Sequence, residues 1–188
     1  MIDKSIIFKI IGSLLFIEAL LLLTCLFMAI GYQEDDVPAF IIAIILTALT
    51  GIVLHYLGRN ADNNMSRRDA YLVVTLSWII FSFFGTLPFV ISGYIPSFTD
   101  AYFETMSGFT TTGATIIDDV DKLPHGLLFW RSMTQWIGGL GIVFFTTAVL
   151  PSFVGGSVKV FAAESTGPIS SRLHPRLSTG AKWIWVVY

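Results

Sequence analysis

Charged residues and cysteines are both scarce in this sequence, and each scarcity excludes a class of protein. Only 13% of the 188 residues are charged, whereas a soluble domain carries roughly a quarter. With 54% hydrophobic residues and a mean hydropathy of +0.75, the chain is predicted to be an integral membrane protein. Cys25 is the only cysteine, so an intramolecular disulfide and a cysteine metal cluster are both excluded.

The sequence also lacks the groupings that mark an enzyme. Its three histidines, His55, His125 and His174, are scattered, and no nucleophile–base pair or metal-ligand spacing accompanies them. We therefore expect neither enzymatic activity nor a cofactor, and no nucleic-acid partner.

Four apolar spans are present, each near the ~20 residues needed to cross a bilayer. They cover residues 6–30, 38–57, 71–94 and 126–150. The first is too long for the core of a signal peptide, so we expect it to be a transmembrane helix. It carries Glu18 in its middle, where an unpaired charge is costly, and we expect this side chain to be protonated or paired across helices.

The segments between the spans alternate in charge. Lysines and arginines occupy the N-terminus, the turn after the second span and the tail: Lys4, Lys9, Arg59, Arg67, Arg68, Lys159, Arg172, Arg176 and Lys182. The other two loops are acidic, with the carboxylates Glu34, Asp35, Asp36, Asp100, Glu104, Asp118, Asp119 and Asp121. The positive-inside rule therefore places both termini in the cytoplasm and both acidic loops outside. An even number of crossings requires the same arrangement.

A shorter apolar helix is predicted between the third and fourth spans. Residues 101–109 have helical character, with Thr99 or Asp100 as the expected cap. This helix is too short to span a membrane and too apolar for an open external loop. We expect it to be re-entrant, with its irregular end shielded by protein or facing a water-filled cavity. The dipole at its C-terminal end would favour a cation near the membrane centre.

A small, hydroxyl-rich segment follows this helix and consists of Thr110, Thr111, Thr112, Gly113, Ala114 and Thr115. It is too polar to face lipid, and its glycine permits backbone angles that other residues resist. Backbone carbonyls of such a segment can replace the water around a cation, as in a selectivity filter. A tight external turn is the alternative. Three aspartates just beyond it either attract cations to its mouth or form an ordinary solvated loop: Asp118, Asp119 and Asp121.

The fourth span opens with a charge and continues with three glycines. Arg131 lies a turn into this span. We expect it to brace the filter by pairing with Glu104 or with carbonyls of the preceding loop, or else to snorkel to the interface. Gly138, Gly139 and Gly141 would let the helix pack closely behind the filter segment.

These motifs together resemble the first pore repeat of the TrkH/TrkG potassium-uptake family, relatives of KtrB and the plant HKT transporters. The resemblance rests on S-G-F-T-T-T-G-A-T at 107–115, W-R-S at 130–132 and Q-W-I-G-G-L-G at 135–141. The preceding two-helix hairpin and the E-S-T-G-P stretch at 164–168 also fit this family.

The resemblance implies an all-α membrane protein with a potassium-channel-like fold. Its expected parts are an N-terminal hairpin (1–69), one helix–re-entrant helix–filter–helix repeat (70–154), a cytoplasmic linker (155–180) and the start of another transmembrane helix (181–188). A complete member has four such repeats around one ion path in the bacterial cytoplasmic (inner) membrane. It forms a homodimer in lipid and is gated by a cytoplasmic TrkA-type nucleotide-binding ring.

The resemblance also assigns roles to residues, with potassium as the transported substrate. The expected filter carbonyls are those of Thr110, Thr111, Thr112, Gly113 and Ala114, with potassium held at Thr111, Thr112 and Gly113. Glu104 and Arg131 are the expected supports. Thr115 stands where potassium channels have a second glycine, which implies a less stringent filter. A non-conducting truncated fragment, an accessory membrane subunit and a homotetrameric cation channel are the alternative functions.

Overall fold

The computed structural model describes residues 4–61 and 67–144, and these ranges contain helices and no strand. The helices are α1 (Lys4–Tyr32), α2 (Val37–Leu57), α3 (Arg67–Gly85), α4 (Leu87–Ser92), α5 (Phe98–Phe109), the 3-10 turn η1 (Val120–Lys122) and α6 (His125–Phe144). The predicted all-α class is confirmed. The linker expected at 155–180 and the helix start expected at 181–188 lie outside the described residues.

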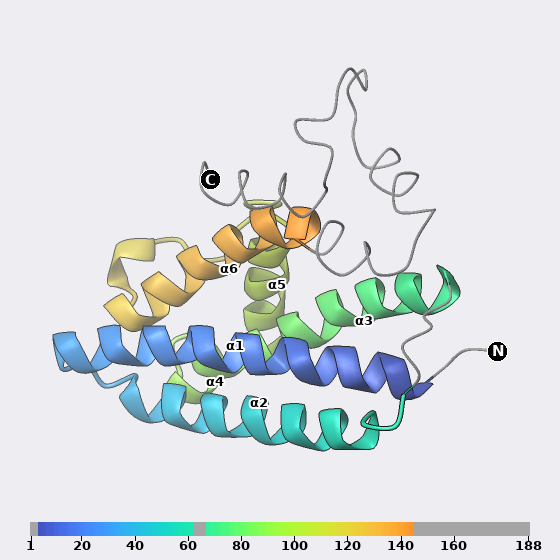
Figure 1. Ribbon diagram of the computed structural model, residues 1–188. Coiled ribbons are helices and arrows are strands. Elements are labelled where there is room, and N and C mark those ends of the chain that lie inside the picture. Colours follow the sequence, from blue (N-terminus) through green and yellow to red (C-terminus); the bar gives the residue numbers. More distant parts are fainter. Residues whose placement is uncertain (1–3, 62–66, 145–188) are drawn as a thin grey trace, which may run out of the picture.

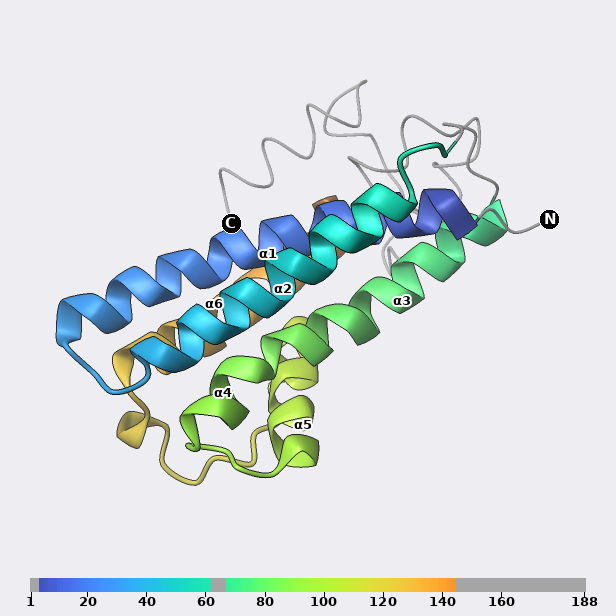
Figure 2. The same ribbon diagram turned by 90° about the horizontal axis from the view of Figure 1, so that it is seen from below.

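Helices α1 and α2 form an antiparallel hairpin that lies along one side of the molecule (Figures 1 and 2). Both are apolar on all sides, as expected for helices surrounded by lipid and protein. Glycines bring the two backbones together, since a Cβ at Gly12 would overlap the backbone of Gly51 and His55. Small residues of this kind replace the hydrophobic effect as the source of helix association in a membrane.

Three helical stretches in the described residues are long and apolar enough to cross a membrane: Lys4–Tyr32, Val37–Leu57 and Tyr71–Ser92. They correspond to the first three predicted spans. The fourth span was predicted over residues 126–150; α6 begins at His125, one residue earlier, and its described part ends at Phe144. The chain is therefore a multi-pass membrane protein.

The third span, predicted over residues 71–94, is divided between two helices. It breaks at Thr86, between α3 and α4. Pro88 has no amide hydrogen and its ring clashes with the carbonyl four residues earlier, so the helical hydrogen-bond ladder is interrupted here. Gly93, with φ of 80°, then ends α4 in the left-handed conformation.

Helix α5 begins earlier than the sequence predicted. Ser97 is its cap, since its hydroxyl accepts a hydrogen bond from the Asp100 amide at 3.4 Å. The expected cap at Thr99 or Asp100 is therefore wrong. The start at Phe98 puts both residues in the first turn, where the charge of Asp100 complements the helix dipole. The helix has 12 residues and runs across the direction of the long helices (Figure 1).

One buried cluster joins the hairpin to the second half of the chain. Its members come from α1, α2, the α4–α5 region and α6: Leu22, Cys25, Ala29, Phe40, Ala43, Phe89, Ile95, Ala101, Phe109, Leu127 and Trp130. Trp130 also donates from Nε1 to the Gly85 carbonyl at 2.8 Å. The break between α3 and α4 leaves this carbonyl without its usual helical partner, so Trp130 satisfies a buried group while it packs.

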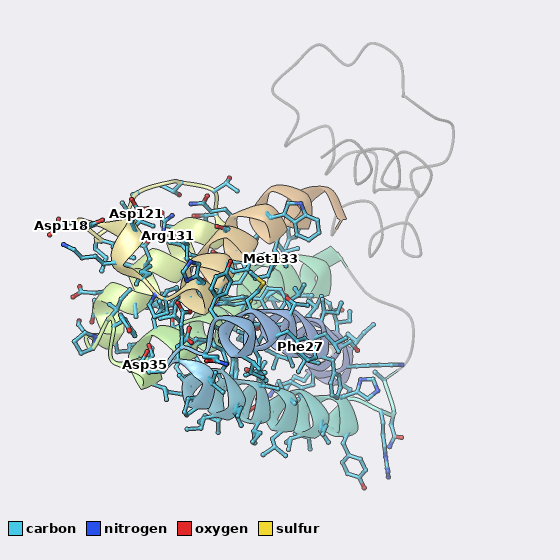
Figure 3. The ribbon with its side chains drawn as sticks, turned by 90° about the vertical axis from the view of Figure 1, so that its left-hand side faces the viewer. Phe27, Asp35, Asp118, Asp121, Arg131 and Met133 are labelled. Carbon is cyan, nitrogen blue, oxygen red and sulfur yellow. The ribbon has the colours of Figure 1, made fainter. Side chains whose placement is uncertain are left out.

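The two acidic loops lie at the same end of the molecule. The α1–α2 turn and the loop that contains η1 are at the left of Figure 1, while the end of α2 and the start of α3 lie at the opposite end, near the start of α1. Figure 3 shows Asp35, Asp118 and Asp121 toward one side, with Arg131 further in. The acidic and the basic segments that alternate along the described part of the sequence therefore lie toward opposite ends of the molecule.

Candidate functional site

The C-terminal end of α5 leads directly into the threonine-rich segment. The amide of Thr111 donates to the Gly108 carbonyl and that of Thr112 to the Ser107 carbonyl, both at 3.0 Å. These two bonds, with Thr111 at a φ of 54°, form a Schellman cap. Glycine or asparagine usually occupies this left-handed position, and a β-branched residue there is an outlier. Strained backbone of this kind is concentrated at functional sites.

The carbonyls of residues 110–113 are the unusual feature of this segment. Within the described part of the chain none of them accepts a hydrogen bond, and all four residues are exposed. Gly113 has a φ of 75°, so left-handed residues occur at 111 and 113. In an extended strand, successive carbonyls point in opposite directions. The left-handed residues Thr111 and Gly113 interrupt this regular alternation of carbonyl direction. Exposed carbonyl oxygens without a hydrogen-bond partner, here a row of four along the chain, are the kind of group that can act as a ligand for a hard cation.

The hydroxyls of Thr110 and Thr112 are both engaged in hydrogen bonds. Thr110 Oγ1 donates to the Met106 carbonyl at 2.8 Å and lies 2.8 Å from Thr112 Oγ1. The hydroxyls therefore hold the backbone against the end of α5, and the main-chain oxygens are left for a ligand.

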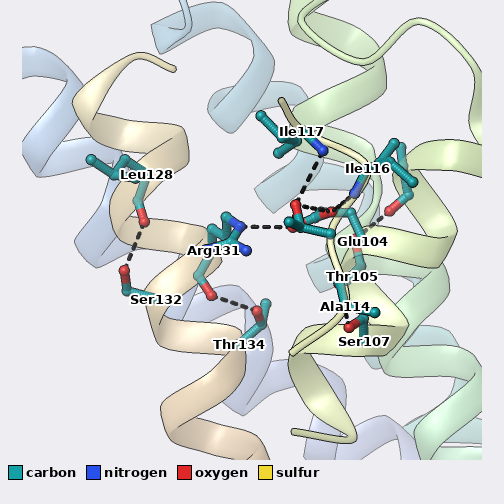
Figure 4. Close-up of polar contacts among 12 residues, drawn as sticks. Glu104, Thr105, Ser107, Ala114, Ile116, Ile117, Leu128, Arg131, Ser132 and Thr134 are labelled. Carbon is teal, nitrogen blue, oxygen red and sulfur yellow. Dashed lines mark hydrogen bonds and ion pairs between the residues drawn. The ribbon is translucent and has the colours of Figure 1, made fainter. Parts of the chain in front are cut away.

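Glu104 anchors the other end of the segment. Its carboxylate accepts the Thr115 hydroxyl at 3.0 and 2.9 Å and the Ile116 amide at 3.1 Å (Figure 4). One helical turn further along α5, Ser107 Oγ donates to the Ala114 carbonyl at 2.6 Å. The segment is thus fixed to α5 at both ends, while residues 110–113 between them keep free carbonyls.

Arg131 on α6 pairs with the same carboxylate. Its Nε lies 2.7 Å from Glu104 Oε1, and the two side chains are 17% and 2% exposed. The structure thus shows the Glu104 pairing rather than loop-carbonyl pairing or snorkelling. A buried pair is costly to break, because either partner alone would be an uncompensated buried charge. One carboxylate therefore links α5, the segment and α6.

Helix α6 packs closely against the C-terminal end of α5 at Gly138, one of the three glycines expected to allow close packing. A Cβ at Gly138 would overlap the Phe109 carbonyl, and one at Gly108 would overlap Thr134. Phe109 also meets Trp130 edge to face, at 6.2 Å between ring centroids. The end of α5 is therefore held in place by close backbone packing.

The three aspartates beyond the segment are exposed. Asp119 pairs with Lys122 at 3.0 Å, and both side chains face solvent. In the described ranges Asp118 and Asp121 form no ion pair, and no group of three potential metal ligands occurs. Their placement near the segment is compatible with either of the predicted roles.

A second polar contact, which was not predicted from the sequence, joins the α1–α2 turn to the start of α6. His125 Nδ1 lies 2.6 Å from Glu34 Oε1, and the His125 ring stacks on Tyr32 at 3.9 Å. The Gly126 amide also donates to Glu34 at 3.4 Å. The only signal in the sequence was an acidic turn and a histidine at the start of a span, which lie 91 residues apart.

Two carboxylates of the turn have opposite pKa shifts. Burial alone would raise the pKa of Glu34, but its hydrogen bonds from His125 and Gly126 outweigh this and lower the pKa. Burial, followed by repulsion from Glu34, raises the pKa of Asp36.

In the first helix, Glu18 is buried and has no hydrogen-bond partner among the described residues, so the predicted pairing across helices is not seen there.

The lowered pKa of Glu34 predicts a pH-dependent stability. Its folded pKa lies below the unfolded value of about 4.3, so its contribution is complete above that value and is lost as the pH falls through the folded pKa. We expect Glu34→Gln to lower the melting temperature of the detergent-solubilised protein near pH 7 by about 2 °C, since the pair is partly exposed.

The difference should be smaller at an acidic pH below the folded pKa of Glu34, because the carboxyl is then uncharged like the glutamine side chain. Asp118→Asn is the control, because Asp118 makes no ion pair in the described residues, and it should have no effect at either pH. A Glu34→Gln effect of the same size at both values would contradict the ionic origin of the contact.

Comparison with known proteins identifies the family. The TrkH family, described as cation transport protein, matches residues 36–188. This chain belongs to the TrkH family. The family consists of transporters, so the prediction that the chain is not an enzyme is confirmed.

Relatives with printed functions match almost the whole chain. TrkH of Halomonas elongata, a Trk system potassium uptake protein, is 36% identical over 97% of this chain and 38% of its own length. TrkG of Escherichia coli, also a Trk system potassium uptake protein, is 34% identical over 94% of this chain and 37% of its own. The chain thus spans less than two fifths of these relatives.

A solved structure shows the same fold. The crystal structure of the potassium transporter TrkH from Vibrio parahaemolyticus has a TM-score of 0.78 at 33% identity, and the match covers 100% of this chain and 37% of that one. The TrkH sequence of the same organism is 34% identical over 98% of this chain. The helical arrangement described above is therefore that of a TrkH-type transporter.

Proposed function

We propose that this chain supplies one of four filter repeats of a Trk-type potassium transporter. The observation that carries the proposal is the row of four unpaired, exposed carbonyls at residues 110–113, which follows the C-terminal end of α5. The printed functions of the relatives support potassium as the transported ion. In this proposal the hairpin α1–α2 precedes the repeat along the chain.

The transport step consists of replacing water around the ion. A potassium ion that reaches the segment exchanges hydration oxygens for carbonyl oxygens of Thr111, Thr112 and Gly113, with Thr110 at the inner end. The partial negative charge at the end of α5 favours the ion at this depth. Because Glu104 and Arg131 fix the segment, its carbonyls need little rearrangement when the ion binds.

The surroundings of the complete transporter follow from the same proposal. It lies in the bacterial inner membrane in contact with lipid, with the acidic loops outside and both ends of this chain in the cytoplasm. It forms a homodimer, and a TrkA-type nucleotide-binding ring gates it from the cytoplasm. No nucleic acid and no cofactor take part.

The proposal is tested by potassium uptake in cells that lack other potassium-uptake systems. The protein used is a full-length Trk-type transporter that carries this chain as its first part, and the decisive variant is Gly113→Ser. If the carbonyl row is the filter, the variant loses preference for potassium at a normal membrane level. If the segment is an ordinary external turn, uptake and preference stay at the wild-type values.

The orientation is tested separately by labelling single cysteines in a Cys25→Ser background. Cysteines introduced at Asp35 and Asp119 should react with a membrane-impermeant reagent added to intact cells. Those at Arg67 and Arg172 should react only after the cells are opened. Labelling of position 67 from outside would contradict the assignment made from the charges.

A further inference from the structure

Ser107 donates a hydrogen bond to a group outside its own helix, unlike several other hydroxyl side chains of the described residues. Serines and threonines within helices usually donate to the carbonyl four residues earlier. Thr105, Thr110 and Ser132 do so, with Ala101, Met106 and Leu128 as their respective acceptors. Ser107 instead donates across to the Ala114 carbonyl, at 2.6 Å (Figure 4).

This bond fixes the direction of one carbonyl in the segment. Ser107 is only 6% exposed, because it lies on the side of α5 that faces protein. The Ala114 carbonyl must therefore point back toward α5, although the residue itself is exposed. The four carbonyls before it have no such partner within the described residues. Ser107 thus marks the point where the row of free carbonyls ends.

We propose that Ser107 is a positioning residue, which limits the ligands of this repeat to the carbonyls of residues 110–113 by holding the Ala114 carbonyl off the ion path. The inference rests on the proposed function of the segment. It also narrows the assignment made from sequence, which counted Ala114 among the ligands.

The physical consequence concerns the outer end of the filter. A carbonyl that already accepts a short hydrogen bond has a fixed direction and one lone pair in use. A cation at this level would then take water as its ligand from this repeat, and so it would bind less tightly. Conduction requires that binding be weak enough for the ion to leave its site. Ser107 would therefore favour rapid release of potassium over tight binding of potassium.

The test is Ser107→Ala in the full-length transporter, assayed by initial rates of potassium uptake. Removal of the hydroxyl frees the Ala114 carbonyl to become an additional ligand. One neutral hydrogen bond corresponds to a change of roughly two- to tenfold in an equilibrium constant. We expect the half-saturating potassium concentration to fall by about that factor, with a lower maximal rate.

Two variants control for general effects. Ser132→Ala removes a hydroxyl of the same kind from α6, where it bonds within its own helix, and should leave both kinetic constants unchanged. Ser107→Thr keeps the hydroxyl and should restore wild-type kinetics. A merely structural role for Ser107 would lower the amount of protein in the membrane and the maximal rate without lowering the half-saturating concentration.

The outcomes separate this inference from the proposed function. An unchanged or raised half-saturating concentration for Ser107→Ala, at equal protein level, overturns the role of Ser107. If Ser107→Ala fails to reach the membrane, Ser107→Cys is measured instead, because its thiol is a weaker donor. The half-saturating potassium concentration of Ser107→Cys should then fall by an intermediate factor. If it does not fall, the role of Ser107 is overturned. If Gly113→Ser behaves as wild type in the same assay, the filter assignment itself is wrong and this inference falls with it.

Discussion

Replacement of Gly113 by serine should abolish most of the preference for potassium over sodium while the membrane level of the transporter stays near normal. Gly113 has a φ of 75°, a conformation that costs a residue with a Cβ roughly 1–2 kcal/mol. A serine relieves this strain by rotating the backbone, which turns a carbonyl away from the ion. The expected loss of preference is therefore roughly 5- to 30-fold.

The structure explains why this change should act on transport rather than on folding. A Cβ added at Gly113 meets no atom within 4 Å, so the side chain itself clashes with nothing. Gly93 is a matched control: its φ is 80°, its Cβ would also be free, and it lies at the end of α4. Gly93→Ser should carry a similar strain and leave ion preference unchanged. Equal losses of preference in both variants would indicate a general effect of strain.

A second glycine gives the opposite behaviour. A side chain at Gly138 would overlap the Phe109 carbonyl, which is backbone and cannot move aside without displacing the end of α5. Gly138→Ser should therefore lower the amount of folded protein in the membrane. The pair Gly113→Ser and Gly138→Ser thus separates conduction from packing, with uptake and protein level measured in parallel.

Loss of the Glu104–Arg131 pair should produce the largest effect on stability. Arg131→Met leaves a carboxylate that is 2% exposed without its cation, and breaking a buried pair from one side costs about 3–5 kcal/mol. We expect a severe loss of folded transporter in the membrane, measured by fluorescence-detected size-exclusion chromatography of a tagged protein. Uptake should fall in proportion or further.

The double variant Glu104→Gln with Arg131→Met should recover much of the folded protein. It removes both charges, and the amide oxygen of glutamine can still accept from Thr115 and Ile116, whose bonds to Glu104 are 2.9–3.1 Å long. Lys122→Met is the control, because its pair with Asp119 is exposed and contributes about 0–1 kcal/mol. If the double variant is no better than Arg131→Met alone, the buried charge is not the cause of the defect.

The sequence predicted the long helices well, because each is a continuous apolar run of the length of a bilayer. It also gave Glu104 as one of a few possible partners of Arg131, because a charged side chain in apolar surroundings has few groups with which it can pair. Gly113 was expected in an unusual backbone conformation because only glycine adopts one readily. These features depend on residues that are close together in the sequence, so they can be predicted without knowledge of the packing.

Other features depend on how the helices are packed, and the sequence does not display them. The residues that compete for the cap of α5 are all good caps, and Ser97 is selected because the helix starts at Phe98. The left-handed Thr111 follows from the Schellman cap, and no threonine predicts such a conformation. The contacts of Ser107 with Ala114 and of Glu34 with His125 require the three-dimensional placement of two separate segments.

The most direct test of the carbonyl row is to locate the ion itself. A crystal structure of the full-length transporter grown with rubidium or thallium, which scatter anomalously and replace potassium, would show where the cation is held. We expect an anomalous peak bound by the carbonyls of Thr111, Thr112 and Gly113, with the Ala114 carbonyl still bonded to Ser107. A peak only beside Asp118 and Asp121, with no cation along residues 110–113, would contradict it.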